Sequence, residues 1–138
     1  MATVIRPQIS KKNKYCINKH RYYELKHFCL QYSEWERAYN AIDAMAQNGQ
    51  QVRTSPTNRV SDMTAECAEK KLYYRQRMDL IRDCCKKTDP DLAEYIFKAV
   101  TSNLGYTYLK TKLEMPASKN AYFDRYRKFF WYLSQARN

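Results

Sequence analysis

Glycine and proline are scarce in this chain, and this scarcity limits the folds open to it more than any other feature. Only 2 glycines and 4 prolines occur among the 138 residues. The tight turns of β-hairpins depend on glycine or Asn-Gly pairs, because their backbones adopt positive φ angles. A fold built from many short strands would lack these turns, so we predict an all-α protein with the length of one domain.

Apolar residues recur at steps of three and four along most of the chain, which is the spacing of amphipathic helices. Within the run 20–46, Ser33 and Glu36 have the spacing of a capping box. This predicts two helices, or one kinked helix, with the break at Tyr32–Ser33. The segment 47–61 is rich in Asn, Gly, Ser, Thr and Pro and predicts a surface loop. We expect a helical bundle with helices at about 20–32, 34–46, 62–87, 90–102, 107–113 and 118–135.

The C-terminal third carries the clearest signals for helix ends. Aspartate and serine are favoured helix caps, proline is favoured at the first helical position, and asparagine and glycine tolerate the left-handed conformation that ends a helix. The order of a helix, a short helix, a turn and a long helix is that of a helix-turn-helix, which we place within 89–138. The residues that predict these ends are Asp89 with Pro90, Asn103 with Gly105, Thr107, Met115 with Pro116, and Ser118.

The N-terminal segment 1–19 has no apolar periodicity and predicts a basic flexible arm. It is either a solvated tail or an arm that grips phosphate through Lys11, Lys12 and Lys14. We expect residues 20–138 to form a single helical domain, because neither side of the loop at 47–61 is large enough for a core of its own.

Charge and cysteine content indicate the partners and the compartment. The net charge is +11, from 25 Lys and Arg against 14 Asp and Glu. Such a charge attracts polyanions, of which nucleic acid is the first candidate and an acidic protein surface the second. The 5 cysteines, two of them adjacent, favour reduced thiols in a cytoplasm over a disulfide framework. We find neither a secretion signal nor an apolar run near the roughly 20 residues that span a membrane.

Signals for catalysis and for metal binding are weak. Cys16, His20, His27 and Cys29 match no common zinc spacing, and on a helix the four would not converge. The chain has no Gly-rich phosphate loop and no paired-carboxylate signature. We therefore expect no metal, no cofactor and no enzymatic activity.

The segment GYTYLKTKLEMPASKNAYFDRYRK, residues 105–128, resembles the helix-turn-helix of sigma-region-4-like domains. Tyr106, Leu109, Leu113 and Met115 stand at its apolar positions, and Ser118 stands at the cap of the recognition helix. The segment departs from the pattern where Lys110 or Thr111 replaces a small alanine, and where large rings occupy positions 122 and 126.

The chain as a whole resembles small proteins of phages and prophages of Gram-positive bacteria. The resemblance rests on RYYELKHFCLQYSEW, residues 21–35, and FDRYRKFFWYL, residues 123–133. These proteins are loosely grouped with late-gene transcription regulators of the ArpU/RinA type. The resemblance implies a DNA-binding transcription regulator in the cytoplasm of the bacterial host cell.

Helical geometry divides the last helix into two faces. Tyr122, Tyr126, Phe129 and Leu133 follow at steps of four, three and four and form the inward stripe. Phe130 and Trp131 exceed what this stripe buries, so we expect them to pack on the first two helices or on a second subunit. The opposite face would enter a major groove, where Asn reads adenine and Arg reads guanine, while flanking cations contact phosphate. The predicted groove-reading residues are Lys119, Asn120, Phe123 and Arg127, and the predicted flanking residues are Arg125 and Lys128.

Further partners follow from the same features. A homodimer would use the long helix at 62–87 or the aromatic residues at 129–132, and would place DNA half-sites about one helical turn apart. The host RNA polymerase is a second expected partner. The alternative function is a small phage-encoded inhibitor or adaptor, like the anti-CRISPR proteins, that binds a host protein or nucleoprotein.

Overall fold

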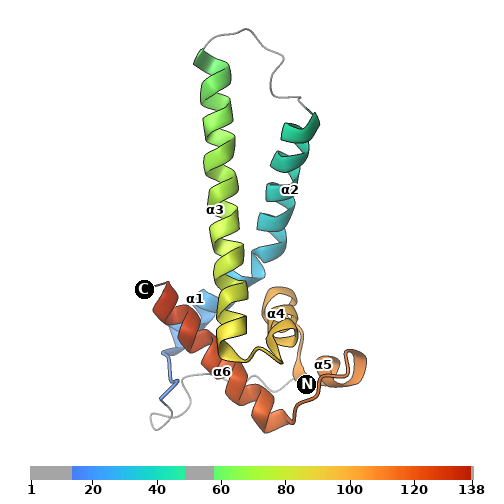
Figure 1. The fold of residues 1–138 in the computed structure, drawn as a ribbon. Coiled ribbons are helices and arrows are strands. Elements are labelled where there is room, and N and C mark those ends of the chain that lie inside the picture. The colour runs from blue at the N-terminus through green and yellow to red at the C-terminus, as the bar shows by residue number, and fades with distance from the viewer. Residues whose placement is uncertain (1–13, 49–57, 138) are drawn as a thin grey trace. The chain divides into compact units, whose positions relative to one another are not determined.

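The computed structural model describes residues 14–48 and 58–137, and within these it describes only the backbone of residues 46–48 and 58–63. The described residues form six helices and no strand, which confirms the all-α prediction (Figure 1). The predicted arm residues Lys11 and Lys12 lie outside the described residues. The helices are α1 (Lys19–Leu30), α2 (Tyr32–Asn48), α3 (Asn58–Thr88), α4 (Ala93–Ser102), α5 (Tyr106–Lys112) and α6 (Lys119–Ala136).

The chain divides into two compact units. We call residues 1–31 together with 80–138 unit 1, and residues 32–79 unit 2. Helix α3 contributes to both, since unit 2 ends at Asp79. That residues 20–138 form one domain stays a prediction.

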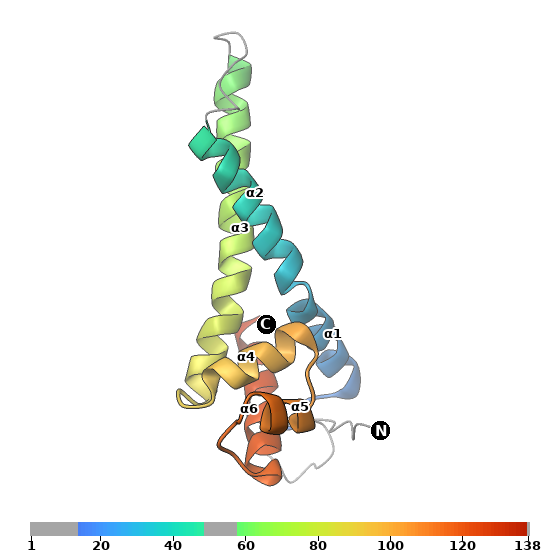
Figure 2. The ribbon, with the colours of Figure 1, turned by 90° about the vertical axis from the view of Figure 1, so that its right-hand side faces the viewer.

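Unit 1 has a core that α1, α4 and α6 build by packing against one another (Figure 2). Leu25 of α1, Ile96 of α4 and Phe129 of α6 are at most 1% exposed. Burial of one such side chain contributes about 1.5–3 kcal/mol to stability. Arg21 adds a polar link between α1 and α6, because its Nε donates to Ser134 Oγ at 3.1 Å and its Nη2 to the Ser134 carbonyl at 3.0 Å.

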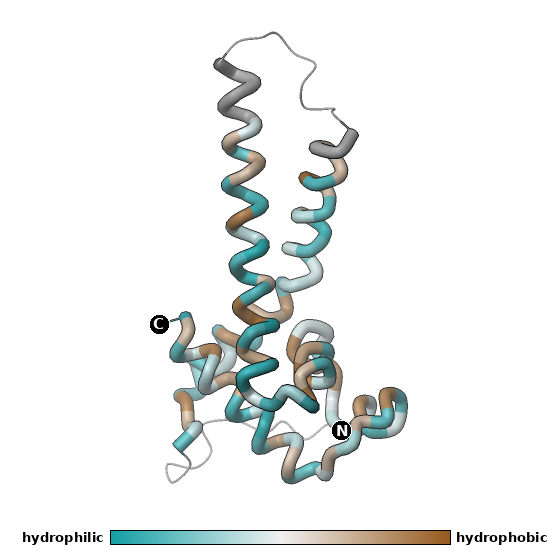
Figure 3. Tube along the Cα trace, viewed as in Figure 1, coloured by the Kyte–Doolittle hydropathy of each residue, from teal (hydrophilic) through white to brown (hydrophobic). Residues whose placement is uncertain are grey.

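Unit 2 consists of α2 and the first part of α3, and few of its described side chains are buried. Tyr32, Trp35 and Met78 are buried, and hydrophilic residues prevail along the rest of both helices (Figure 3). Lys71 joins the two helices, because its Nζ donates to Asp43 Oδ1 at 2.8 Å and lies 5.1 Å from the ring centroid of Tyr39.

The first two helices meet two residues earlier than the capping box predicts. Helix α1 ends at Leu30, its C-cap is Gln31, and α2 already begins at Tyr32. Ser33 therefore lies inside the first turn of α2 and is not its cap. Tyr32 is only 6% exposed, and burial of a tyrosine ring stabilises this first turn more than a surface cap does. Within unit 2, α3 begins at Asn58, before the predicted start at 62.

The start of α4 also differs from the prediction. Asp89 caps a turn and not the helix itself, because its Oδ1 accepts from the backbone N–H of Asp91 at 3.0 Å and of Leu92 at 3.4 Å. Pro90 lies in this turn, and α4 begins only at Ala93. The turn ends α3 and redirects the chain into α4.

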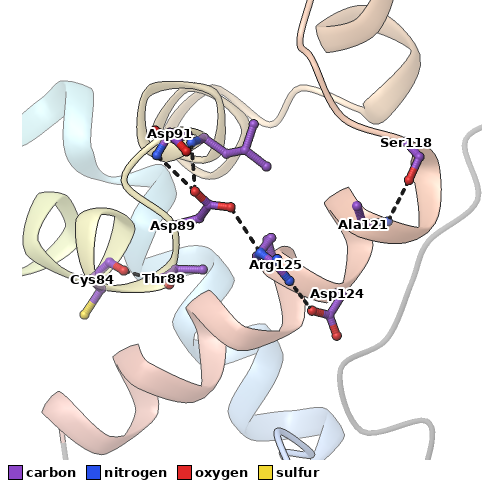
Figure 4. Close-up of polar contacts among 9 residues, drawn as sticks. Cys84, Thr88, Asp89, Asp91, Ser118, Ala121, Asp124 and Arg125 are labelled. Carbon is purple, nitrogen blue, oxygen red and sulfur yellow. Dashed lines mark hydrogen bonds and ion pairs between the residues drawn. The ribbon is translucent and has the colours of Figure 1, made fainter.

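Two of the helix ends predicted between α4 and α6 are wrong. Asn103 ends α4 in the left-handed conformation, with φ of 56°, as predicted. Gly105 has extended backbone angles and is itself the N-cap of α5, so it neither ends α4 nor needs glycine's freedom. Thr107 is consequently the second residue of α5 and not its cap. Ser118 caps α6 as predicted, since its Oγ accepts from the Ala121 N–H at 3.2 Å (Figure 4).

Candidate nucleic-acid interface

The net charge of the protein is confined to one of its two units. Unit 1 holds 18 Lys and Arg against 7 Asp and Glu, a net charge of +11. Unit 2 holds 7 of each and is neutral. The two counts add up to the 25 cations and 14 carboxylates of the whole chain. The net positive charge that would attract a polyanion therefore belongs to unit 1.

Aromatic side chains anchor α6, as the inward stripe predicts. Tyr122, Phe129 and Leu133 are at most 2% exposed. Tyr126 is half-buried, and its hydroxyl lies 2.8 Å from the Tyr22 hydroxyl of α1. Burial raises the pKa of the Tyr126 hydroxyl, the neighbouring Tyr22 adds to the effect, and burial also raises the pKa of Tyr122. The helix is therefore held on one side and presents its other side outward.

The rings beyond this stripe also pack within unit 1. Phe130 is fully buried, with its ring centroid 5.0 Å from that of Tyr22, which confirms packing on the first helix. Trp131 is half-buried and meets the Tyr15 ring edge-on at 5.4 Å. Tyr15 precedes α1, so Trp131 packs on the segment that leads into the first helix.

Three of the four residues predicted to enter a groove are accessible to solvent on α6. Lys119 and Asn120 are exposed in the first turn, next to the cap Ser118. Arg127 lies two turns after Asn120 and is half-exposed. Within the described residues, none of Lys119, Asn120 and Arg127 forms a side-chain hydrogen bond or an ion pair, so their polar groups face solvent.

Phe123, the fourth predicted residue, belongs to the aromatic contacts between α5 and α6. Its ring centroid lies 5.3 Å from that of Tyr122 and 6.1 Å from that of Tyr106. Phe123 is half-buried, so part of the ring supports α5. Sequence reasoning missed this supporting contact, because nothing local indicates which side of α6 faces α5.

Arg125 makes ion pairs inside unit 1, although we predicted it to flank the DNA site and contact phosphate. Its Nε donates to Asp89 Oδ2 at 3.1 Å, and its Nη1 donates to Asp124 Oδ2 at 2.5 Å (Figure 4). The hydrogen bond with Asp89 is the main cause that raises the pKa of Arg125. Arg125 thus ties α6 to the turn between α3 and α4. The two partners stand 36 residues apart, and no local pattern predicts their pairing.

The other predicted phosphate contacts lie beside aromatic rings. Lys128 Nζ is 5.7 Å from the ring centroid of Tyr15 and 5.9 Å from that of Tyr132. Lys14 is exposed, and its Nζ is 5.0 Å from the ring of its neighbour Tyr15. Lys87, at the end of α3, was not predicted to take part in binding, yet its Nζ is 4.8 Å from the Tyr132 ring.

The connection between α5 and α6 is longer than the predicted motif requires. It comprises the six residues between Lys112 and Lys119, whereas the turn of a helix-turn-helix usually has three or four. Lys110 or Thr111 stands where the resemblance expects a small alanine, and Lys110 Nζ donates to the carbonyls of Met115 and Ala117, each at 3.3 Å. The lysine thus satisfies carbonyls of the longer turn. The order of the helices agrees with a helix-turn-helix, but the assignment itself stays a prediction.

The cysteines are all free thiols, and three of them are buried. Burial raises the pKa of Cys84 to about 11 and raises the pKa of Cys29 and Cys85 as well. Such thiols stay protonated at neutral pH and are poor nucleophiles. Within residues 14–48 and 58–137 no three described His, Cys, Asp or Glu side chains gather as a metal ion would need. In the same ranges no helix combines the length and the apolar character needed to cross a membrane.

Comparison of the chain with models of protein families, with curated proteins and with solved structures finds no match. The case for a function therefore rests on the residues described above.

Proposed function

We propose that the protein is a phage or prophage transcription regulator that binds DNA through unit 1 and reads it with α6. The observation that carries this proposal is the confinement of the +11 net charge to unit 1, while unit 2 is neutral. The face of α6 that is free of internal pairing belongs to the same unit. Charge and an accessible polar helix face thus coincide in one part of the molecule, as in proteins that bind the major groove.

Each of the three solvent-facing residues has a role that its chemistry suggests. Lys119 lies in the first turn of α6, where the positive helix end and a lysine together attract a phosphate. Asn120 suits adenine and Arg127 suits guanine, both through paired hydrogen bonds. The two residues are seven positions apart, about 10 Å along the helix axis, which corresponds to about three base pairs.

The experiment begins with selection of a preferred site from a library of random duplexes and continues with binding titrations on that site. We expect Arg127→Ala to weaken binding about 5- to 150-fold and to relax the preference at one base pair. Lys98→Ala is the matched control, because Lys98 is an exposed cation of unit 1 that lies on α4. If Arg127→Ala binds the selected site as tightly as the unmodified protein, α6 does not read DNA.

Salt dependence tests the electrostatic part of the same proposal. Neutralisation of six to ten phosphates lowers affinity about 10³- to 10⁵-fold between 50 and 200 mM salt. An affinity that stays constant over this range would contradict binding through the positive charge of unit 1.

A second candidate function is an inhibitor or adaptor that binds a host protein or nucleoprotein. It is favoured by unit 2, which is neutral and exposes Met45, Leu72 and Tyr73 by 41–55%. Exposed apolar side chains of this kind suit a protein contact. Co-purification from host extract, once without nuclease to recover DNA and once with nuclease to recover protein partners, separates the two functions. An adaptor would retain its host partner in the Lys119→Ala, Arg127→Ala double variant and lose it in Leu72→Glu, whereas a DNA reader would lose DNA only in the former.

A further inference from the structure

One group of side chains in unit 1 is not used by the proposed groove reading. It combines three aromatic rings with three lysines, drawn from the segment before α1, the end of α3 and the second half of α6. We call it the cation-ring cluster, and its members are Lys14, Tyr15, Lys87, Lys128, Trp131 and Tyr132.

The three rings of the cluster form one aromatic surface. The ring centroid of Trp131 lies 5.4 Å from that of Tyr15 and 5.3 Å from that of Tyr132, both with edge-on geometry. Tyr15 and Tyr132 are 6.5 Å apart. All three residues are half-buried, whereas the core ring Phe130, next to Trp131 in sequence, is fully buried. The cluster therefore keeps part of its aromatic surface in contact with solvent.

The lysines bring positive charge to the rings. Each of Lys14, Lys87 and Lys128 has its Nζ within 4.8–5.9 Å of a ring centroid of the cluster. Within the described residues none of these lysines forms an ion pair, although unit 1 contains 7 carboxylates. The position of Lys87 in the last turn of α3 suits the helix dipole, but this does not account for its approach to Tyr132.

We propose that the cation-ring cluster binds single-stranded nucleic acid, with an unpaired base stacked on its rings and the adjacent phosphates held by its lysines. Partly exposed aromatic rings beside positively charged lysines are the combination with which proteins hold unpaired strands. In a duplex the faces of the bases are covered by neighbouring base pairs, so the rings of the cluster cannot stack on them. This site is distinct from the outward face of Lys119, Asn120 and Arg127, and the proposal does not depend on the reading of a groove by α6.

Tryptophan fluorescence offers a direct test, because the chain has only 2 tryptophans. Trp35 is a buried residue of unit 2, so Trp35→Phe leaves Trp131 as the sole reporter. The probes are oligothymidylate and oligouridylate of about 15 nucleotides, compared with a duplex of equal length. We expect both single strands to quench Trp131 fluorescence in a saturable way, since a stacked base quenches the ring that it covers. Equal quenching by the duplex, or none by either strand, would overturn the proposal.

Neighbouring lysines of α3 provide a matched pair of variants. Lys87 contacts a ring of the cluster, whereas Lys86 is an equally exposed neighbour without such a contact. We expect Lys87→Ala to weaken single-strand binding several-fold and Lys86→Ala to leave it nearly unchanged. Tyr132→Ala should weaken it about 5- to 150-fold, the range for loss of one stacked base. Equal effects of Lys86→Ala and Lys87→Ala would show that binding follows overall charge and not the cluster.

Two further arms separate this site from groove reading and from a protein contact. Arg127→Ala should weaken site-specific duplex binding about 5- to 150-fold and leave single-strand binding unchanged. The two proposals are therefore tested by different measurements, and one can fail while the other holds. Tighter binding of oligothymidylate or of oligouridylate tells DNA from RNA as the natural strand. If neither strand binds while a protein partner protects Trp131 from a soluble quencher, the cluster is a protein interface and the proposal is wrong.

Discussion

The paired hydroxyls of Tyr22 and Tyr126 allow a quantitative test of how α6 is held on α1. Their oxygens are 2.8 Å apart, and Tyr22 is 1% exposed. Tyr126→Phe removes one hydroxyl and leaves the ring, whose centroid lies 5.0 Å from that of Phe130, in place. The Tyr22 hydroxyl then stays buried without this partner.

The expected cost follows from this loss of a partner. A buried polar group left unsatisfied costs about 1–3 kcal/mol, whereas a pair of polar groups replaced by apolar ones is nearly neutral. We therefore expect Tyr126→Phe to lower the free energy of unfolding by about 1–3 kcal/mol. The double variant Tyr22→Phe, Tyr126→Phe should be closer in stability to the unmodified protein than the sum of the two single variants.

Urea unfolding of the unmodified protein, the two single variants Tyr22→Phe and Tyr126→Phe and the double variant measures the coupling between the two hydroxyls as a double-mutant cycle. Tyr23→Phe is the control, because Tyr23 is a half-buried neighbour whose ring contacts Tyr22 at 5.2 Å. Removal of the Tyr23 hydroxyl should lower the free energy of unfolding by less than about 0.5 kcal/mol. If the effects of the two core variants simply add, the hydroxyl pair contributes no coupling, and packing of the rings alone holds the helices together.

Three further predictions concern the supports of α6 and the stability of unit 1. Arg125→Met should lower the free energy of unfolding by only about 1 kcal/mol, because the Arg125 side chain is 37% exposed and solvent screens its ion pair with Asp89. The same substitution made in the Asp89→Asn background, where this ion pair is already absent, should cost less. Ser118→Ala should cost about 1 kcal/mol through loss of the cap, measured by urea unfolding, and an unchanged midpoint would mean that the cap is replaced by solvent. The free energy of unfolding should be highest below about pH 9 and should fall as the pH rises further. Burial raises the pKa of Cys84 and of Tyr122 in the folded protein, so the unfolded chain loses these protons first. Thermal unfolding between pH 7 and 11 checks this, and a flat profile would contradict it.

The signals that predicted the fold correctly act over a few residues. Ser118 caps α6 through an N–H three positions ahead, and the stripe from Tyr122 to Leu133 repeats at the pitch of the helix. Where the predictions failed, a local preference competed with packing. Thr107 is a good cap by residue type, yet α5 begins one residue earlier, next to Gly105.

The candidate site was predictable only where exposure follows from helical phase. Asn120 and Arg127 are accessible to solvent because they lie roughly opposite the buried stripe of α6, whereas Lys119 is exposed because it is the first residue of the helix. The roles of Arg125 and Lys87 were not predictable, because each depends on a residue more than thirty positions away.

The sequence by itself determined that the protein is helical, where most helices lie, and that the net charge is strongly positive, since these properties depend on composition and on short-range periodicity. Only the tertiary structure decided which residues share a unit, and therefore that all of the net charge lies in unit 1 and none in unit 2. It likewise decided that Arg125 pairs with Asp89, and that three rings and three lysines meet in one cluster. The physical reason is that such contacts join distant parts of the chain, and their geometry exists only after the core has packed.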